Sequence, residues 1–141
     1  MSQLQDHHDI VQLTHAYCWA LDEREWDALR DVFTPDAVTD LGLDGQNGID
    51  EIIGRVSSAL SYFDISQHQV ATHQIQIEGD TASGRCYLHA QHVKKDSPGG
   101  DNLMIGARYE DDYVRTADGW RIAKRDIVFM WMEGNRAILD R

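Results

Sequence analysis

The sequence predicts an α+β fold in which helices come first and an antiparallel meander follows. The spacing of apolar residues changes once along the chain, after Phe63, from every three or four residues to every second residue. Beyond that point, Asp118 and Gly119 form an Asp-Gly hairpin signal between two strand-like runs. These two observations predict three N-terminal helices and a short strand, packed against a strongly curved, mostly antiparallel sheet.

The helical half contains three amphipathic segments. The first is expected from Asp6 to Glu23, because apolar side chains recur at helical spacing, at Ile10, Leu13, Tyr17 and Leu21. A shorter second helix is expected over 26–33, ending before Pro35, and a third over 49–60.

Short connecting elements and four longer strands make up the rest. A short strand is expected over AVTDLGL (37–43) and a turn over 44–48. The longer strands are expected over SQHQVATHQIQIEG, DTASGRCYLHAQHVKK, LMIGARYEDDYVRT and WRIAKRDIVFMWME. In the last strand, parity places Arg125 on the face of three apolar residues, Ile127, Phe129 and Trp131. This arginine therefore either stands at the mouth of an apolar pocket or points to solvent.

Composition limits the classes of function. A chain of 141 residues is expected to form one domain, 1–141, without disulfides or metal as supports. The net charge of −11 argues against binding to nucleic acid or to an anionic membrane surface. Cys18 and Cys86 have no metal-site spacing, and His89 and His92 should face opposite sides of a strand, so no metal is expected. With no signal peptide or membrane span in the sequence, a cytoplasmic location is expected.

Asp22 is an unusual residue at the end of the first helix, five residues after Tyr17. Its carboxylate either faces solvent or accepts a hydrogen bond from a histidine, which would fix the tautomer of that histidine and raise its basicity. His68 and His73 are the candidate partners. They face opposite sides of a regular strand, with His73 inward by pattern, and a β-bulge between them would reverse this relation.

Several motifs resemble the SnoaL-like branch of the nuclear transport factor 2-like superfamily. They are Y-x4-D, WDALRDVFTPDA, HQVATHQIQIEGDTA, ARYEDDYVR and GWRIAKRD, and together they cover the chain from about Asp9 to Gly134. The resemblance implies a cone-like α+β barrel around a pocket. Within this branch, the functional analogies are bile acid 7α-dehydratase, hexachlorocyclohexane dehydrochlorinase and scytalone dehydratase. These enzymes use a histidine–aspartate dyad without a cofactor.

Carried over to this chain, the resemblance assigns the catalytic positions to Tyr17, Asp22, His68 and Arg125. Members of this branch often have asparagine four residues after the histidine, where this chain has Thr72. The implied activity is that of a carbon–oxygen lyase of the dehydratase type with no cofactor and no metal. His68 would act as the general base, with His73 as the alternative, and Tyr17 and Arg125 would stabilise the developing anion.

The expected substrate is a small hydrophobic cyclic molecule, which is expected to contact apolar and aromatic side chains at Phe33, Leu88, Ile105, Tyr109, Phe129 and Trp131. Isomerisation or polyketide-type cyclisation would use the same base. Epoxide hydrolysis would need a second carboxylate, for which Asp111 is the candidate, and a non-catalytic binding or assembly module is the remaining alternative. The resemblance also implies a homo-oligomer, with a trimer favoured over a dimer, and the apolar residues on both faces of the last strand agree with a subunit interface.

Overall fold

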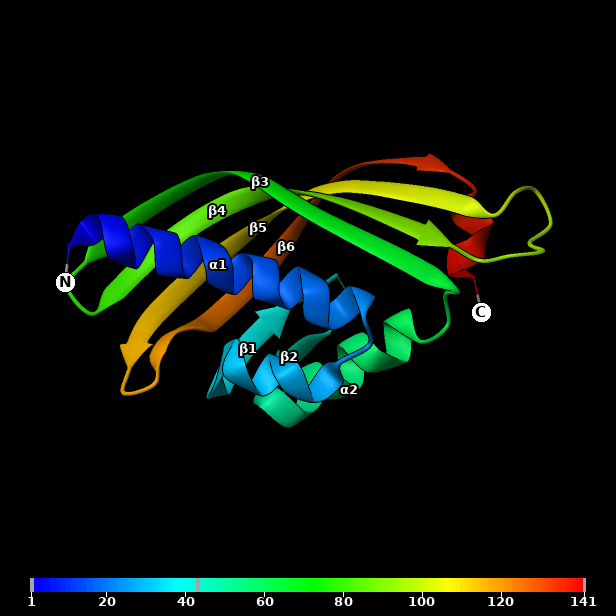
Figure 1. Cartoon of the computed structure of the whole chain (residues 1–141). Coiled ribbons are helices and arrows are strands. Elements are labelled where there is room, and N and C mark those ends of the chain that lie inside the picture. The colour runs from blue at the N-terminus through cyan, green and yellow to red at the C-terminus, as the bar shows by residue number, and fades with distance from the viewer. Residues whose placement is uncertain (1, 43, 141) are drawn as a thin grey trace.

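The computed structural model describes residues 2–42 and 44–140 as an open six-stranded sheet with helices on one of its sides (Figure 1). The helical elements are α1 (Gln3–Asp22), the 3₁₀ turn η1 (Trp26–Asp31), α2 (Ile49–Leu60) and the 3₁₀ turn η2 (Arg136–Leu139). The strands are β1 (Phe33–Asp40), β2 (Gly45–Asn47), β3 (Ile65–Glu78), β4 (Thr81–Val93), β5 (Asn102–Thr116) and β6 (Gly119–Gly134).

The strands follow the order β2-β1-β6-β5-β4-β3. The four long strands form an antiparallel meander, as the alternating pattern predicts, while β1 joins the far edge by pairing in parallel with β6. In Figure 1, α1 lies across the long strands, and α2 lies beside β1 and β2 near the far end of α1. The opposite side of the sheet carries no helix among the described residues. The prediction of an α+β fold with N-terminal helices is therefore confirmed.

Two details of the predicted architecture are wrong. The sheet is neither strongly curved nor closed into a cone-like barrel; it bends over α1 and stays open at both edges (Figure 1). The second helix is a six-residue 3₁₀ turn, because β1 already begins at Phe33 and takes in Pro35. Pro35 has no backbone N–H to donate, and the pairing of β1 with β6 is irregular between Phe33 and Val38.

The predicted first and third helices are confirmed as α1 and α2. The apolar stripe of α1 is buried against the sheet and contributes Ile10, Leu13, Tyr17 and Leu21 to the core. The third helix has the predicted bounds, and its buried face contains Ile52, Val56 and Leu60. No helix in the part of the chain that the structure describes is long and apolar enough to cross a bilayer.

Three β-bulges in the long strands decide which side chains face α1, and one of them leaves Ala123 of β6 as an extra residue between the partners of Asp112 and Tyr113. In β3, Thr72 and His73 together stand opposite the single residue Cys86 of β4. In β6, Met130 is the extra residue between the partners of Gly106 and Ala107 in β5. Each bulge shifts the alternation of its strand by one residue, so side chains before and after it follow different parities.

Candidate active site

His68 and Asp22 form a direct pair between β3 and the C-terminal end of α1. His68 Nδ1 lies 2.6 Å from Asp22 Oδ1, and the backbone N–H of His68 donates to Asp22 Oδ2 at 2.8 Å. The histidine side chain is 6% exposed and the aspartate side chain 15%. Because an ionised carboxylate can only accept, Nδ1 is the donor, which leaves Nε2 as the nitrogen able to take a proton from a ligand.

The chain turn after α1 holds the Asp22 carboxylate in place. Arg24 adopts a left-handed backbone conformation, and its guanidinium donates to the Leu21 carbonyl at 2.8 Å and to Ser66 Oγ at 2.7 Å. The Ser66 hydroxyl in turn donates to Asp22 Oδ1 at 3.1 Å. With three donors directed at it, the carboxylate has a fixed orientation toward the imidazole.

His68 forms part of the wall of a cavity of about 750 Å³ enclosed by α1, α2 and the helix-covered face of the sheet. Most of the wall is apolar. Of the six predicted contact residues, four line this cavity, namely Leu88, Ile105, Tyr109 and Phe129. A cavity of this size accommodates a molecule of one or more rings.

The other two predicted contact residues do not line the cavity. Phe33 is buried behind Tyr17, with the two rings in edge-to-face contact at 5.8 Å. Trp131 follows the bulge in β6, so it lies on the helix-free face, packed over Gly106 and against the ring of His89. Met132 takes its place in the cavity wall.

Tyr17 and Tyr109 lie side by side in the wall with their rings 5.6 Å apart in edge-to-face contact. Burial raises the pKa of Tyr17 to about 12 and also raises the pKa of Tyr109 well above its usual value. Both hydroxyls are therefore protonated at neutral pH and can donate a hydrogen bond to an oxygen of a ligand.

Arg125 lies behind this tyrosine pair and does not line the cavity. Its guanidinium stands 4.5 Å from the ring centre of Tyr17 and 3.9 Å from that of Tyr109. Asp111 accepts two hydrogen bonds from it at 2.8 Å and a third from Tyr113 at 2.7 Å. Although burial opposes the charge, this ion pair holds the pKa of Arg125 well above its usual value. Arg125 therefore contacts the cavity only through the two tyrosine rings.

His73 faces the same side of the sheet as His68, because the bulge in β3 lies between them. The hydroxyl of Thr14 donates to the Val11 carbonyl at 2.7 Å, and its oxygen lies 2.8 Å from His73 Nε2. Since the only hydroxyl proton is committed, His73 donates through Nε2 and anchors β3 to α1. It does not line the cavity with His68.

Two polar residues of the cavity wall are absent from the set predicted from sequence, His92 and Arg55. The His92 ring lies 6.0 Å from the His68 ring, and its Nδ1 is buried without a hydrogen-bond partner among the described residues. Burial lowers the pKa of His92 to about 4. Parity could have identified it, since His92 alternates with Leu88 and Ala90 along β4.

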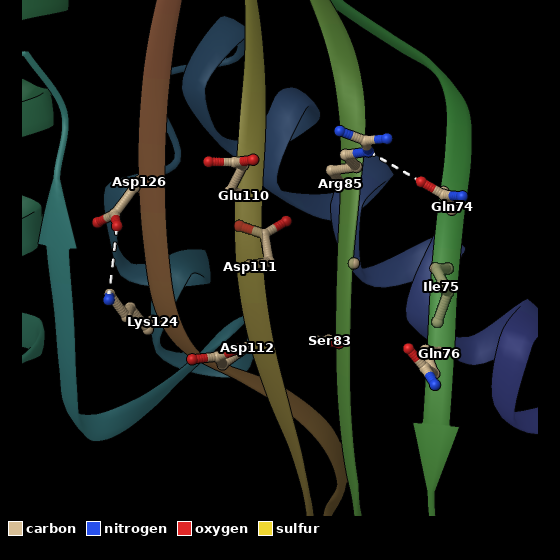
Figure 2. Close-up of a pocket in the computed structure, with 11 residues that line it drawn as sticks. Gln74, Ile75, Gln76, Ser83, Arg85, Glu110, Asp111, Asp112, Lys124 and Asp126 are labelled. Carbon is tan, nitrogen blue, oxygen red and sulfur yellow. Dashed lines mark hydrogen bonds and ion pairs between the residues drawn. The ribbon is translucent and has the colours of Figure 1, made fainter.

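A second hollow, of about 710 Å³, lies on the helix-free face of the sheet (Figure 2). Its polar side chains interact with one another: Lys124 with Asp126 along β6 at 3.6 Å, and Arg85 of β4 with Gln74 of β3 at 2.8 Å. This hollow is open and carries charges of both signs, as expected for a solvated sheet surface. Across residues 2–42 and 44–140, no three His, Cys, Asp or Glu side chains are grouped in a way that would hold a metal ion.

The order of the helices and strands agrees with the resemblance to the nuclear transport factor 2-like superfamily that the sequence motifs indicate. The chain belongs to the SnoaL-like domain family of that superfamily, whose family model matches residues 2–126. An uncharacterized protein of Mycobacterium tuberculosis strain H37Rv is 36% identical over 132 residues, covering 89% of this chain and 86% of the relative.

Solved structures resemble the whole fold. A Novosphingobium aromaticivorans protein, provisionally named an aromatic ring hydroxylase, is 31% identical, with a TM-score of 0.86 over 99% of this chain and all of that chain. A hexachlorocyclohexane dehydrochlorinase is 16% identical, with a TM-score of 0.85 over 94% and 90% of the two chains. A Salmonella enterica protein of the superfamily is 15% identical, with a TM-score of 0.84 over 92% and 94%. The last two are likenesses of fold.

Proposed function

We propose that this protein is a cofactor-independent lyase of the dehydratase type, acting on a small, largely apolar cyclic substrate. The observation that carries the proposal is the 2.6 Å contact of His68 Nδ1 with Asp22 Oδ1 in the wall of an apolar cavity. His68 Nε2 removes a carbon-bound proton, the electron pair of that bond forms the new double bond, and the bond from the β-carbon to oxygen breaks. Asp22 stabilises the imidazolium that forms.

The two tyrosines of the wall act on the leaving group. Tyr17 and Tyr109 keep their protons at neutral pH, so their hydroxyls donate hydrogen bonds to the oxygen on which negative charge develops. The proton taken up by His68 leaves with the hydroxide as water, which restores the starting state. Arg125 acts as a positioning residue, since its guanidinium touches the rings of both tyrosines.

The environment of Asp111 favours elimination over epoxide hydrolysis. Both oxygens of Asp111 are held by Arg125, one of them also by Tyr113, and its carboxylate does not line the cavity. An oxygen so enclosed has no path to a water beside the substrate. Isomerisation or cyclisation would begin with the same proton abstraction at His68 and would differ in the fate of the electron pair.

The test is a panel of cyclic β-hydroxy ketones incubated with the protein in deuterated water and followed by NMR. We expect an unsaturated product, together with deuterium at the carbon next to the carbonyl of recovered substrate. His68→Asn and Asp22→Asn should each lower the rate by about a hundredfold or more, the scale of lost general-base catalysis, without loss of fold. A parallel incubation uses water labelled with oxygen-18. If that oxygen appears in the product, the reaction is a hydrolysis and the proposal is contradicted.

His73→Asn is the matched control, because His73 lies on the same strand and faces the same side. Its effect on turnover should be much smaller, since its Nε2 contacts Thr14 rather than the cavity. If His73→Asn abolishes turnover while His68→Asn is active, the assignment of the base is wrong.

A further inference from the structure

The charge of the cavity wall differs from that of the chain as a whole. The sequence has 24 acidic and 13 basic residues. Among the described residues that line the cavity there is no aspartate, glutamate or lysine, and the one arginine is Arg55 of α2. Burial lowers the pKa of His92 to about 4, so His92 adds no charge at neutral pH. A permanent positive charge therefore stands in an otherwise largely apolar wall.

Arg55 has no acceptor within the described part of the chain. Its Nε is buried without a hydrogen-bond partner, and no carboxylate of residues 2–42 and 44–140 forms an ion pair with it. Some other arginines of the fold are paired with carboxylates, such as Arg30 with Asp50, on the same helix as Arg55, and the buried Arg125 with Asp111. A buried donor without an acceptor is costly, and a ligand that supplies the acceptor relieves that cost.

We propose that Arg55 binds a carboxylate of the substrate, so that the substrates are apolar cyclic carboxylic acids. One guanidinium matches one negative charge, and its planar fork fits a carboxylate in two parallel hydrogen bonds. Arg55 comes from α2 and His68 from β3, so the acid group and the reacting carbon are held at separate points of the wall. The inference rests on the proposed function, since it assigns the substrate class of the same cavity.

The experiment measures binding of two probes of nearly equal shape, naphthalene-2-carboxylate and the neutral naphthalene-2-carboxamide, by calorimetry on the full chain. We expect the carboxylate to bind at least tenfold more tightly than the amide. Arg55→Gln should remove that preference and leave the affinity for the amide unchanged, while Arg55→Lys should keep part of it. Arg85→Gln, on the helix-free face, is the matched control, because it changes the net charge equally and should leave both affinities unchanged.

Equal affinity of the wild type for the two probes overturns the proposal. So does an equal loss of affinity for both probes in Arg55→Gln, and so does the absence of carboxylate binding at millimolar concentration. Circular dichroism shows whether Arg55→Gln retains its fold, and Arg55→Lys keeps the test decisive if it does not. Because binding is measured rather than turnover, the outcome is separate from that of the deuterium experiment. A carboxylate site without elimination would leave this inference standing and contradict only the proposed reaction.

Discussion

At the scale of single residues, the site depends on the two ring nitrogens of His68. Nδ1 donates a hydrogen bond to Asp22, which leaves Nε2 able to accept a proton. Tyr17, Asp22 and His68 were assigned from sequence through their spacing and the family resemblance, and the structure brings the last two into contact. Arg125 was assigned as well, but its burial behind the tyrosines could not be deduced from parity. Parity says which side of a strand a residue faces, whereas depth depends on the neighbouring strands.

His92 makes the stability of the protein sensitive to acid. Burial lowers its pKa from 6.5 to about 4, so the folded state favours the neutral ring. The unfolded chain then binds more protons between these values, and stability falls as pH drops from about 6.5 to about 4. The resulting loss in the free energy of unfolding amounts to about 3 kcal/mol once His92 is protonated in both the folded and the unfolded state.

His92→Gln should remove this part of the pH dependence. Urea unfolding at pH 7 and at pH 4 is the measurement, and the variant should lose less stability than the wild type over that interval. His89→Gln is the control, because His89 lies on the helix-free face against Trp131. Identical pH profiles for wild type and His92→Gln would contradict the prediction.

At the scale of elements, the periodicity of apolar residues predicts the positions of the two long helices, because a helix forms from contacts between residues close in the sequence. The bounds of α2 follow from its apolar stripe, and α1 begins three residues before and ends one residue before the predicted first helix. The β-bulges could not be placed from sequence, because a bulge is a property of two paired strands. The bulges account for the error at Trp131, which points away from the cavity, and they place His73 on the same face as His68.

The bulge in β3 also carries a backbone cost. Thr72 has φ of 59°, in the left-handed region that β-branched residues avoid and asparagine tolerates. This is the position at which members of the family often have asparagine. Thr72→Asn should therefore stabilise the protein by about 1 kcal/mol, as measured by urea unfolding.

Thr81→Asn is the control for this prediction, because Thr81 begins β4 and is not among the residues with positive φ. It should bring no gain, since asparagine is a poorer strand residue than threonine. If both substitutions change stability alike, strain at Thr72 is not the cause.

At the scale of the whole molecule, the start of α1 is tied to the hairpin that joins β5 and β6. Asp6 accepts two hydrogen bonds from Arg115, at 2.8 and 2.9 Å, and one from the Trp120 indole at 3.1 Å. These hydrogen bonds lower the pKa of Asp6 to about 2. No sequence pattern predicts this contact, because the partners are more than a hundred residues apart.

Asp6→Asn should lower the melting temperature at neutral pH by several degrees, since it breaks a buried network. A lowered carboxyl pKa contributes stability that is fully present above the unfolded value of 3.8 and is lost as pH falls through about 2. The deficit of the variant should therefore shrink toward pH 2. Asp80→Asn is the control, because Asp80 pairs with the same Arg115 from an exposed position and should matter less.

Assembly is the remaining property of the whole molecule, and we expect a homotrimer. The resemblance supplies the number, and the helix-free face supplies the surface. Tyr87, Met130 and Trp131 are between 42% and 50% exposed. The neighbouring part of that face is polar, as Figure 2 shows, so the apolar side chains form a limited patch of the kind that a partner subunit covers.

Light scattering at micromolar concentration is the measurement, and the expected mass is three times the 16.1 kDa of one chain. Trp131→Glu should shift the mass toward the monomer, because a charge cannot be buried in the interface without a partner. Trp19→Glu is the matched control: Trp19 is 67% exposed but lies on α1, on the other side of the molecule, and its substitution should leave the mass unchanged. A monomeric wild type would contradict the expectation. If the wild type is a dimer that Trp131→Glu dissociates, the helix-free face is the interface but the predicted number of subunits is wrong.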